Sequence, residues 1–207
     1  MKKIIVIAFG IIAVAIPMFA QGEGMKFGVS STISSSPTIG VRFLVQQSFD
    51  LRLAYSFVNN TSTRDYTNIS FLGSTTASLE TRLIDQALTL GGAFYIFSRP
   101  LNEIAVMRAY SGASATYTNQ QCSGPELLLV DTPPSGIEYK IKSTAADFYT
   151  ITLFGGSEIV LFNAVSFFGE AGIEYSTGKR ILPFSVSSNP ATTITTFSGN
   201  LGVVYYF

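Results

Sequence analysis

The sequence predicts an all-β protein: an eight-stranded antiparallel up-and-down transmembrane β-barrel, preceded by a cleaved signal peptide. Three observations predict this fold class. Only 13% of the 207 residues are charged, against about 25% in soluble domains. No internal run of about 20 apolar residues could form a spanning helix. Apolar residues instead alternate repeatedly with small or polar ones over about ten positions, which is the pattern of strands whose outer face meets lipid.

Residues 1–20 are the expected signal peptide. Lys2 and Lys3 precede an unbroken apolar run over residues 4–16, and the segment ends at the small residue Ala20. A charged start, a short apolar run and a small residue at the cleavage point are typical of secretory signals. A membrane-anchor helix is the alternative, which the shortness of the run disfavours. Residues 21–207 would then form the barrel domain.

Three strands are expected in the first third of the chain, at residues 25–33, 39–45 and 49–57. The third shows the cleanest alternation, with five large apolar side chains on one face and polar or small ones on the other. The apolar face consists of Phe49, Leu51, Leu53, Tyr55 and Phe57. Since side chains alternate between faces of a strand, one face would meet lipid and the other the barrel interior.

A long polar segment, residues 59–85, is expected to be a surface loop, with arms that could extend beyond the membrane. Residues 86–97 form the next expected strand, and a short turn leads to a weak strand at residues 103–117, whose phase is ambiguous. Arg108 is placed inward there, because a charge that faces lipid near the midplane costs roughly 2–4 kcal/mol.

Residues 118–145 are the second expected long loop. A short hairpin within it, at residues 127–142, would raise the count from eight strands to ten. Residues 148–160 and 165–176 are expected strands joined by a tight turn near Phe162 and Asn163. A last loop then leads to the final strand, residues 197–207. Tight turns at one end and long loops at the other are typical of outer-membrane barrels.

The final strand carries apolar residues at alternate positions, Leu201, Val203, Tyr205 and Phe207. It resembles the C-terminal signature of bacterial outer-membrane β-barrels, which the barrel assembly machinery reads in that family. This resemblance implies the assembly machinery and outer-membrane lipid as partners, and the bacterial outer membrane as the location.

The layout of the chain resembles the small OmpA/OmpX-type barrel domains, without a periplasmic domain. Two glycine-rich stretches of the expected sixth and seventh strands also carry this likeness, Gly155-Gly156-Ser157-Glu158 and Gly169-Glu170-Ala171-Gly172-Ile173-Glu174-Tyr175.

Several kinds of chemistry are excluded or disfavoured by composition. The sequence has no His, which excludes Ser–His–Asp triads and His-based zinc sites. Glu170 and Glu174 would lie roughly 13 Å apart on one strand face, at about 3.3 Å per residue, which is too far for a glycosidase pair. The single Cys122 can form no intramolecular disulfide, and its polar neighbours suggest a surface loop. No basic patch suggests a nucleic-acid partner. We expect no enzyme activity, no cofactor and no metal.

Six charged side chains are expected to face the barrel interior. They are Arg42, Arg52, Arg108, Glu158, Glu170 and Glu174. An eight-stranded barrel is just wide enough for its own side chains. A structural network that neutralises itself is therefore favoured, and a gated pore or a ligand site is the alternative.

The favoured function is a non-enzymatic outer-membrane protein whose surface loops have a structural, adhesive or protective role. The first alternative is a narrow pore or conduit for small solutes or apolar molecules. The second is a soluble periplasmic lipocalin-like binding barrel, in which the large apolar faces would point inward.

Overall fold

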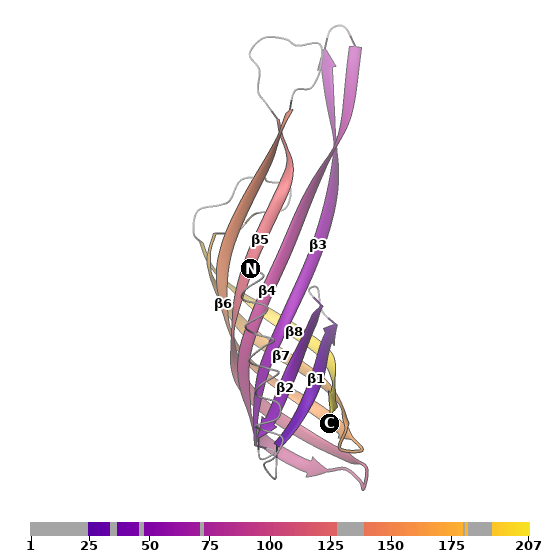
Figure 1. Cartoon of the computed structure of the whole chain (residues 1–207), viewed down its shortest axis with the longest axis vertical. Coiled ribbons are helices and arrows are strands. Elements are labelled where there is room, and N and C mark those ends of the chain that lie inside the picture. The colour runs from indigo at the N-terminus through magenta and orange to yellow at the C-terminus, as the bar shows by residue number, and fades with distance from the viewer. Residues whose placement is uncertain are drawn as a thin grey trace.

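The chain forms a closed antiparallel barrel in a computed structural model that describes residues 25–33, 37–45, 48–70, 73–127, 139–179, 181 and 192–207. Each strand pairs with its neighbours in sequence, and the last pairs with the first (Figure 1). The strands are β1 (Met25–Ile33), β2 (Thr38–Val45), β3 (Phe49–Ser70), β4 (Gly73–Pro100), β5 (Ala105–Leu127), β6 (Tyr139–Leu161), β7 (Val165–Gly178) and β8 (Thr192–Tyr206). The eight-stranded up-and-down barrel is confirmed. The expected signal peptide lies outside the described residues.

Pairing between β8 and β1 closes the barrel. Their register runs from Gly28 opposite Tyr206 to Ile33 opposite Leu201. The Phe207 N–H donates a further hydrogen bond of 2.8 Å to the Phe27 carbonyl. Closure removes the unpaired edges that an open sheet would offer to other chains. The expected partnership of the C-terminal segment with the strand that begins near Met25 is confirmed.

The outer face of the barrel is apolar and uncharged over most of its height. On β6 every outward position from Tyr149 to Ile159 is uncharged, and Ile151 and Leu153 are 54% and 64% exposed. Ten residues span roughly 33 Å along a strand, or about 25 Å of height at a tilt of about 40°. This matches the apolar band of membrane barrels. We call it the outer band. The lipocalin-like arrangement, with apolar faces inward, is wrong.

The two ends of the barrel differ. At the turn end, β2–β3, β4–β5 and β6–β7 are joined by short connections. The β6–β7 turn has positive φ at Phe162 (52°) and Asn163 (56°), and the Ala164 N–H donates to the Leu161 carbonyl over 3.0 Å. Consecutive positive φ values are those of a type I′ hairpin turn, so the expected tight turn at this position is confirmed. The other end is called the loop end.

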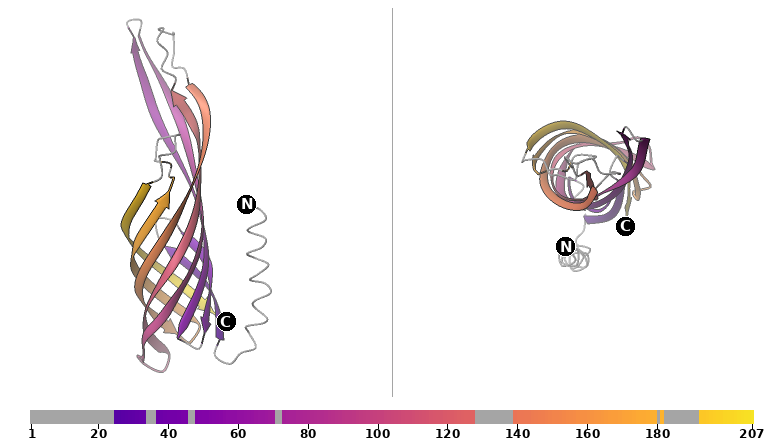
Figure 2. Two further views of the ribbon diagram at one scale, coloured as in Figure 1. Left: turned by 90° about the vertical axis from the view of Figure 1, so that its left-hand side faces the viewer. Right: turned by 90° about the horizontal axis from the view of Figure 1, so that it is seen from above.

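Four strands continue beyond the outer band at the loop end (Figures 1 and 2). β3 and β4 stay paired as far as Ser70 opposite Gly73, and β5 and β6 as far as Leu127 opposite Tyr139. The sequence-based loops at 59–85 and 118–145 are therefore mostly strand, although the expected extended arms are present. Beyond the outer band both faces of a hairpin meet water, so apolar alternation disappears while backbone pairing persists.

The ten-stranded alternative is wrong for the same reason. Its two extra arms, at residues 127–142, are the ends of β5 and β6 rather than an independent hairpin, so far as the structure describes them.

An extra residue interrupts the alternation of β4, whereas β5, whose phase the sequence left ambiguous, alternates without a break. The register between these strands shifts between Tyr95 and Phe97, so Ile96 and Phe97 both lie on the outer face. Beyond the shift, Arg108 pairs with Ser98 on β4 and is buried in the interior. The inward placement of Arg108 is confirmed. No helix in the described part of the chain is long and apolar enough to cross a membrane.

Gly156 lets the interior close around large side chains. A Cβ at this inward position would lie 2.9 Å from Tyr110 Cζ, 2.9 Å from Glu170 Cγ and 2.6 Å from the Gly169 carbonyl. We predict that Gly156→Val destabilises the barrel by about 1–3 kcal/mol, the usual effect of overpacking. The measurement is the urea midpoint of the protein in detergent micelles, followed by its migration on unheated gels.

Gly155→Val is the matched control. A Cβ on this neighbouring glycine, which points outward, would meet only the Tyr110 carbonyl, at 3.8 Å. Its midpoint should therefore stay near that of the native chain. Equal losses in the two variants would contradict the packing described for Gly156.

Candidate functional site: the barrel lumen

The turn-end half of the lumen is filled by side chains. Leu44, Phe168, Val204 and Tyr206 form a buried apolar group, against which the partly buried Tyr95 packs. They come from β2, β7, β8 and β4, so they fill the lumen from several sides. Because strand side chains alternate, these residues turn inward from positions next to outward-facing apolar residues.

Arg42 lies at the centre of a cluster of charges beside this apolar group. Its guanidinium is 3.5 Å from Asp50 Oδ2, 3.9 Å from Glu158 Oε2 and 3.9 Å from Glu170 Oε1. Its side chain is only 4% exposed, and those of Asp50 and Glu158 are fully buried. One arginine therefore faces three carboxylates, which it cannot neutralise alone.

Two further arginines balance the cluster. Arg52 Nε donates to Asp50 Oδ2 over 2.7 Å, and its Nη1 forms an ion pair with Glu170. Arg108 Nη1 lies 3.5 Å from Glu158 Oε1. The cluster thus holds three arginines and three carboxylates, and its formal charge is zero. We call these six residues the lumen ion cluster.

Neighbouring rings and hydroxyl groups support the cluster. Tyr110 Oη donates to Glu170 over 2.8 Å, and Ser166 Oγ donates to Glu158 over 3.0 Å. The Arg42 guanidinium lies 4.0 Å from the centre of the Phe168 ring, within the range of cation–π attraction. The cluster and the apolar group therefore form one packed unit.

The structure brings together five of the six charged residues expected inside the barrel, all except Glu174. Asp50 belongs to the lumen ion cluster but was not among the six. The signal that could have identified it is its position two residues before Arg52 on the same face of β3.

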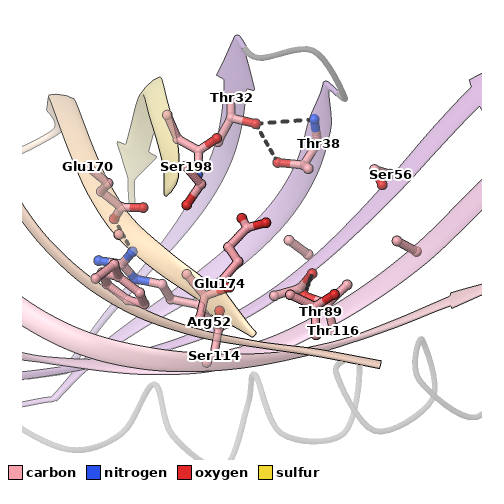
Figure 3. Close-up of a pocket in the computed structure, with 18 of the residues that line it drawn as sticks. Thr32, Thr38, Arg52, Ser56, Thr89, Ser114, Thr116, Glu170, Glu174 and Ser198 are labelled. Atoms are coloured by element: carbon pink, nitrogen blue, oxygen red, sulfur yellow. Dashed lines mark hydrogen bonds and ion pairs between the residues drawn. The ribbon is translucent and has the colours of Figure 1, made fainter. Parts of the chain in front are cut away.

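A cavity of about 570 Å³, lined by both polar and apolar side chains, lies on the loop-end side of the lumen ion cluster (Figure 3). We call it the vestibule. Its wall is rich in hydroxyl groups, and two facing pairs bond to each other: Thr32 with Thr38 at 2.7 Å, and Thr89 with Thr116 at 2.8 Å. Arg52 and Glu170 lie at its boundary with the cluster.

Glu174 lines the vestibule, four residues beyond Glu170 on the same face of β7. Figure 3 shows its side chain extending into the cavity. No residue in the described part of the chain forms a hydrogen bond or an ion pair with its carboxylate. Asp85 is a second carboxylate in the vestibule wall. Burial raises its pKa, and a hydrogen bond with Gln120 offsets this only in part.

Ile181 packs against the inner wall near the loop end. Its N–H donates to Gln120 Oε1 over 2.9 Å, and its side chain is buried with Cys122 and Ala146, next to Leu83. Cys122 was expected in a surface loop, but it lies buried on the extended part of β5, and burial raises the pKa of its thiol. Cys122 is not in a loop because the polar residues around it belong to β5 and pair with β6.

The lumen offers charge neutralisation and polar surface rather than an activated nucleophile. The carboxylates of the cluster are held by arginines, and Glu174 has no general acid or base partner within the described residues. Nor does that part of the chain hold a group of three or more Cys, Asp or Glu residues that could bind a metal ion.

Comparison with solved structures shows the fold of small bacterial outer-membrane barrels. A major outer-membrane protein from Thermus thermophilus is 12% identical, with 89% of this chain and 100% of that chain covered and a TM-score of 0.50. The N-terminal β-barrel domain of OprF from Pseudomonas aeruginosa is 13% identical, with coverage of 90% and 100% and a TM-score of 0.37. Ail from Yersinia pestis is 11% identical, with coverage of 88% and 95% and a TM-score of 0.35.

No protein-family model matches the chain, and no curated protein matches its sequence. The resemblance to OmpA/OmpX-type barrels is therefore shown at the level of the fold.

Replacing Glu158 tests the lumen ion cluster, because Arg42 and Arg108 both form ion pairs with its carboxylate. We predict that Glu158→Gln lowers the free energy of unfolding by about 3–5 kcal/mol, since Arg108 would lose its only carboxylate partner among the described residues. The measurement is equilibrium urea unfolding in detergent micelles. Adding Arg108→Met to this variant should recover part of the loss.

Glu174→Gln is the matched control, since it makes the same chemical change at an inward carboxylate that has no partner within the described residues. It should leave the urea midpoint close to that of the native chain. A comparable loss in Glu174→Gln, or none in Glu158→Gln, would contradict a structural role for the cluster.

Proposed function

We propose that this chain is a non-enzymatic protein of the bacterial outer membrane that holds two β-hairpins at the cell surface, in a structural, adhesive or protective role. The observation that carries the proposal is the uncharged apolar outer band on a closed barrel. Twenty-eight large apolar side chains are exposed among the described residues. Exposing so much apolar surface to water is unfavourable, whereas lipid acyl chains can cover it.

The filled turn-end half of the lumen supports a role other than conduction. Arg42, Phe168 and their neighbours occupy the interior at the level of the outer band, with Asp50 and Glu158 fully buried. A solute on a direct path would have to separate paired charges in a space of low polarity, which costs several kcal/mol. This disfavours the narrow-pore alternative.

The two projecting hairpins support an adhesive role. Pairing between β2 and β3 stops at Thr38 opposite Ser56, whereas β3 continues to Ser70. Pairing between β6 and β7 likewise stops at Phe148 opposite Gly178, whereas β6 begins at Tyr139. The outer edges of the hairpins therefore have no neighbouring strand among the described residues. An unpaired strand edge is a surface to which an extended segment of another protein can add.

The proposed route to the membrane uses the C-terminal strand. Leu201, Val203, Tyr205 and Phe207 all face outward on or just beyond β8, and are 66%, 37%, 50% and 73% exposed. An outward apolar row on the closing strand is available to the barrel assembly machinery, which is the proposed partner together with outer-membrane lipid.

Localisation and topology can be tested together in a Gram-negative host. We predict that the protein stays in the outer-membrane fraction after alkaline washing, because the outer band is covered by lipid. Protease added to intact cells should cut only within the β3–β4 and β5–β6 hairpins. Recovery in the soluble periplasmic fraction, or cleavage within the outer band, would contradict the proposal.

The filled lumen leads to a separate prediction on conductance. Purified protein in planar lipid bilayers should show no steady channel openings, since the lumen ion cluster blocks a direct path. The Glu158→Gln variant should be measured beside it. Loss of this carboxylate leaves Arg42 and Arg108 with fewer ion pairs, so we expect irregular channel openings. Regular, salt-dependent openings of the native chain would instead support the pore alternative.

A further inference from the structure

We infer that the vestibule is a binding site for a small hydroxylated organic cation, such as an amino sugar, with Glu174 as its charged anchor. This goes beyond the proposed surface role, because it assigns a ligand class to the inside of the barrel. The inference rests on the shape of the cavity, its charge and the unused hydrogen-bonding groups of its wall.

The size and shape of the vestibule suit a bound solute. Its volume of about 570 Å³ lies within the range of about 300–1,000 Å³ found for ligand pockets. The lumen ion cluster and the apolar group fill the lumen on one side of it, so it is a pocket that ends inside the barrel rather than part of a passage.

The charge of the vestibule favours a cation. The lumen ion cluster is neutral, so its arginines are already matched by Asp50, Glu158 and Glu170. Glu174 adds a carboxylate that no described residue pairs with, and Asp85 adds another in the wall. The vestibule wall holds three carboxylates, those of Asp85, Glu170 and Glu174, against the two arginines Arg42 and Arg52. An excess of negative charge in a cleft attracts cations.

The hydroxyl groups of the wall favour a ligand with several polar groups. Three serines line the vestibule, Ser56 from β3, Ser114 from β5 and Ser198 from β8 (Figure 3). None of their hydroxyl groups has a hydrogen-bond partner among the described residues. Asn200 adds an amide with both donors and an acceptor. An apolar solute would leave these groups unpaired, which is unfavourable, whereas hydroxyl groups can pair with them.

The test is an NMR titration of the full chain in non-ionic detergent at low salt, with three probes. Glucosamine carries both an ammonium group and hydroxyl groups, glucose has the hydroxyl groups without the charge, and tetramethylammonium has the charge without the hydroxyl groups. Glucosamine should produce saturable shifts at the amides of Gly172, Glu174 and Ser198. Its Kd should be about tenfold lower than that of either other probe.

Two variants show whether Glu174 carries the binding. Glu174→Gln should raise the Kd of glucosamine about tenfold, because it removes the charge and keeps the shape. Glu80→Gln is the matched control, since Glu80 is an exposed carboxylate on the extension of β4, and its Kd should be unchanged. Ser198→Leu, which narrows the vestibule without changing charge, should weaken binding in a second, independent way.

Three results would overturn the inference: shifts that never saturate, equal affinity for glucose and glucosamine, or unchanged binding in Glu174→Gln. Each variant is first checked for its native urea midpoint, so that loss of binding is not loss of fold. Because the measurement uses protein in detergent, its outcome is independent of where the barrel resides in the cell.

Discussion

The narrow interior of an eight-stranded barrel is the constraint on which the rest of this structure depends. At the level of the lumen ion cluster the interior holds side chains and little else, so a charge placed there needs a partner within reach. Arg42, Arg52 and Arg108 meet three carboxylates at the level of the outer band, and the formal charges balance. Gly156 lies beside this cluster because Tyr110 and Glu170 occupy the space that a Cβ would take. Charge balance and packing are therefore two consequences of one limit on space.

The environment outside the barrel explains why the same strands change character along their length. Within the outer band, the outward positions are uncharged and mostly apolar, as in the alternation of β6 from Tyr149 to Ile159. Beyond it, β3 and β4 stay hydrogen-bonded as far as Ser70 and Gly73, although their residues are mainly polar. The backbone pairing of a hairpin does not require an apolar face once water replaces lipid. The projecting hairpins are continuous with strands of the closed barrel, which holds their bases in place.

The fold was predictable from the sequence where apolar and polar residues alternate along a strand, because the alternation shows which face is outward. The outward face of residues 49–57 followed from the alternation of apolar and polar residues, and the inward direction of Arg108 from the energy of placing a charge in lipid. The projecting strands were mistaken for loops, because rows of Thr, Ser and Asn show no contrast between faces. Asp50 shares a strand face with Arg52, which places it inside the barrel, but only the three-dimensional register shows that Arg42 reaches it as well. The shift between Tyr95 and Phe97 left no sequence signal that alternation could detect.

Glu170 and Glu174 show how position along one strand determines what a side chain can do. Both face the lumen from β7, and about 13 Å separates residues four apart on a strand. Glu170 lies within reach of Arg52 and Tyr110, and its charge is used within the lumen ion cluster. Glu174 lies four residues nearer the loop end, among hydroxyl groups that bring no charge. The cluster therefore divides the lumen into a filled half and an open half, in which the Glu174 carboxylate has no partner among the described residues.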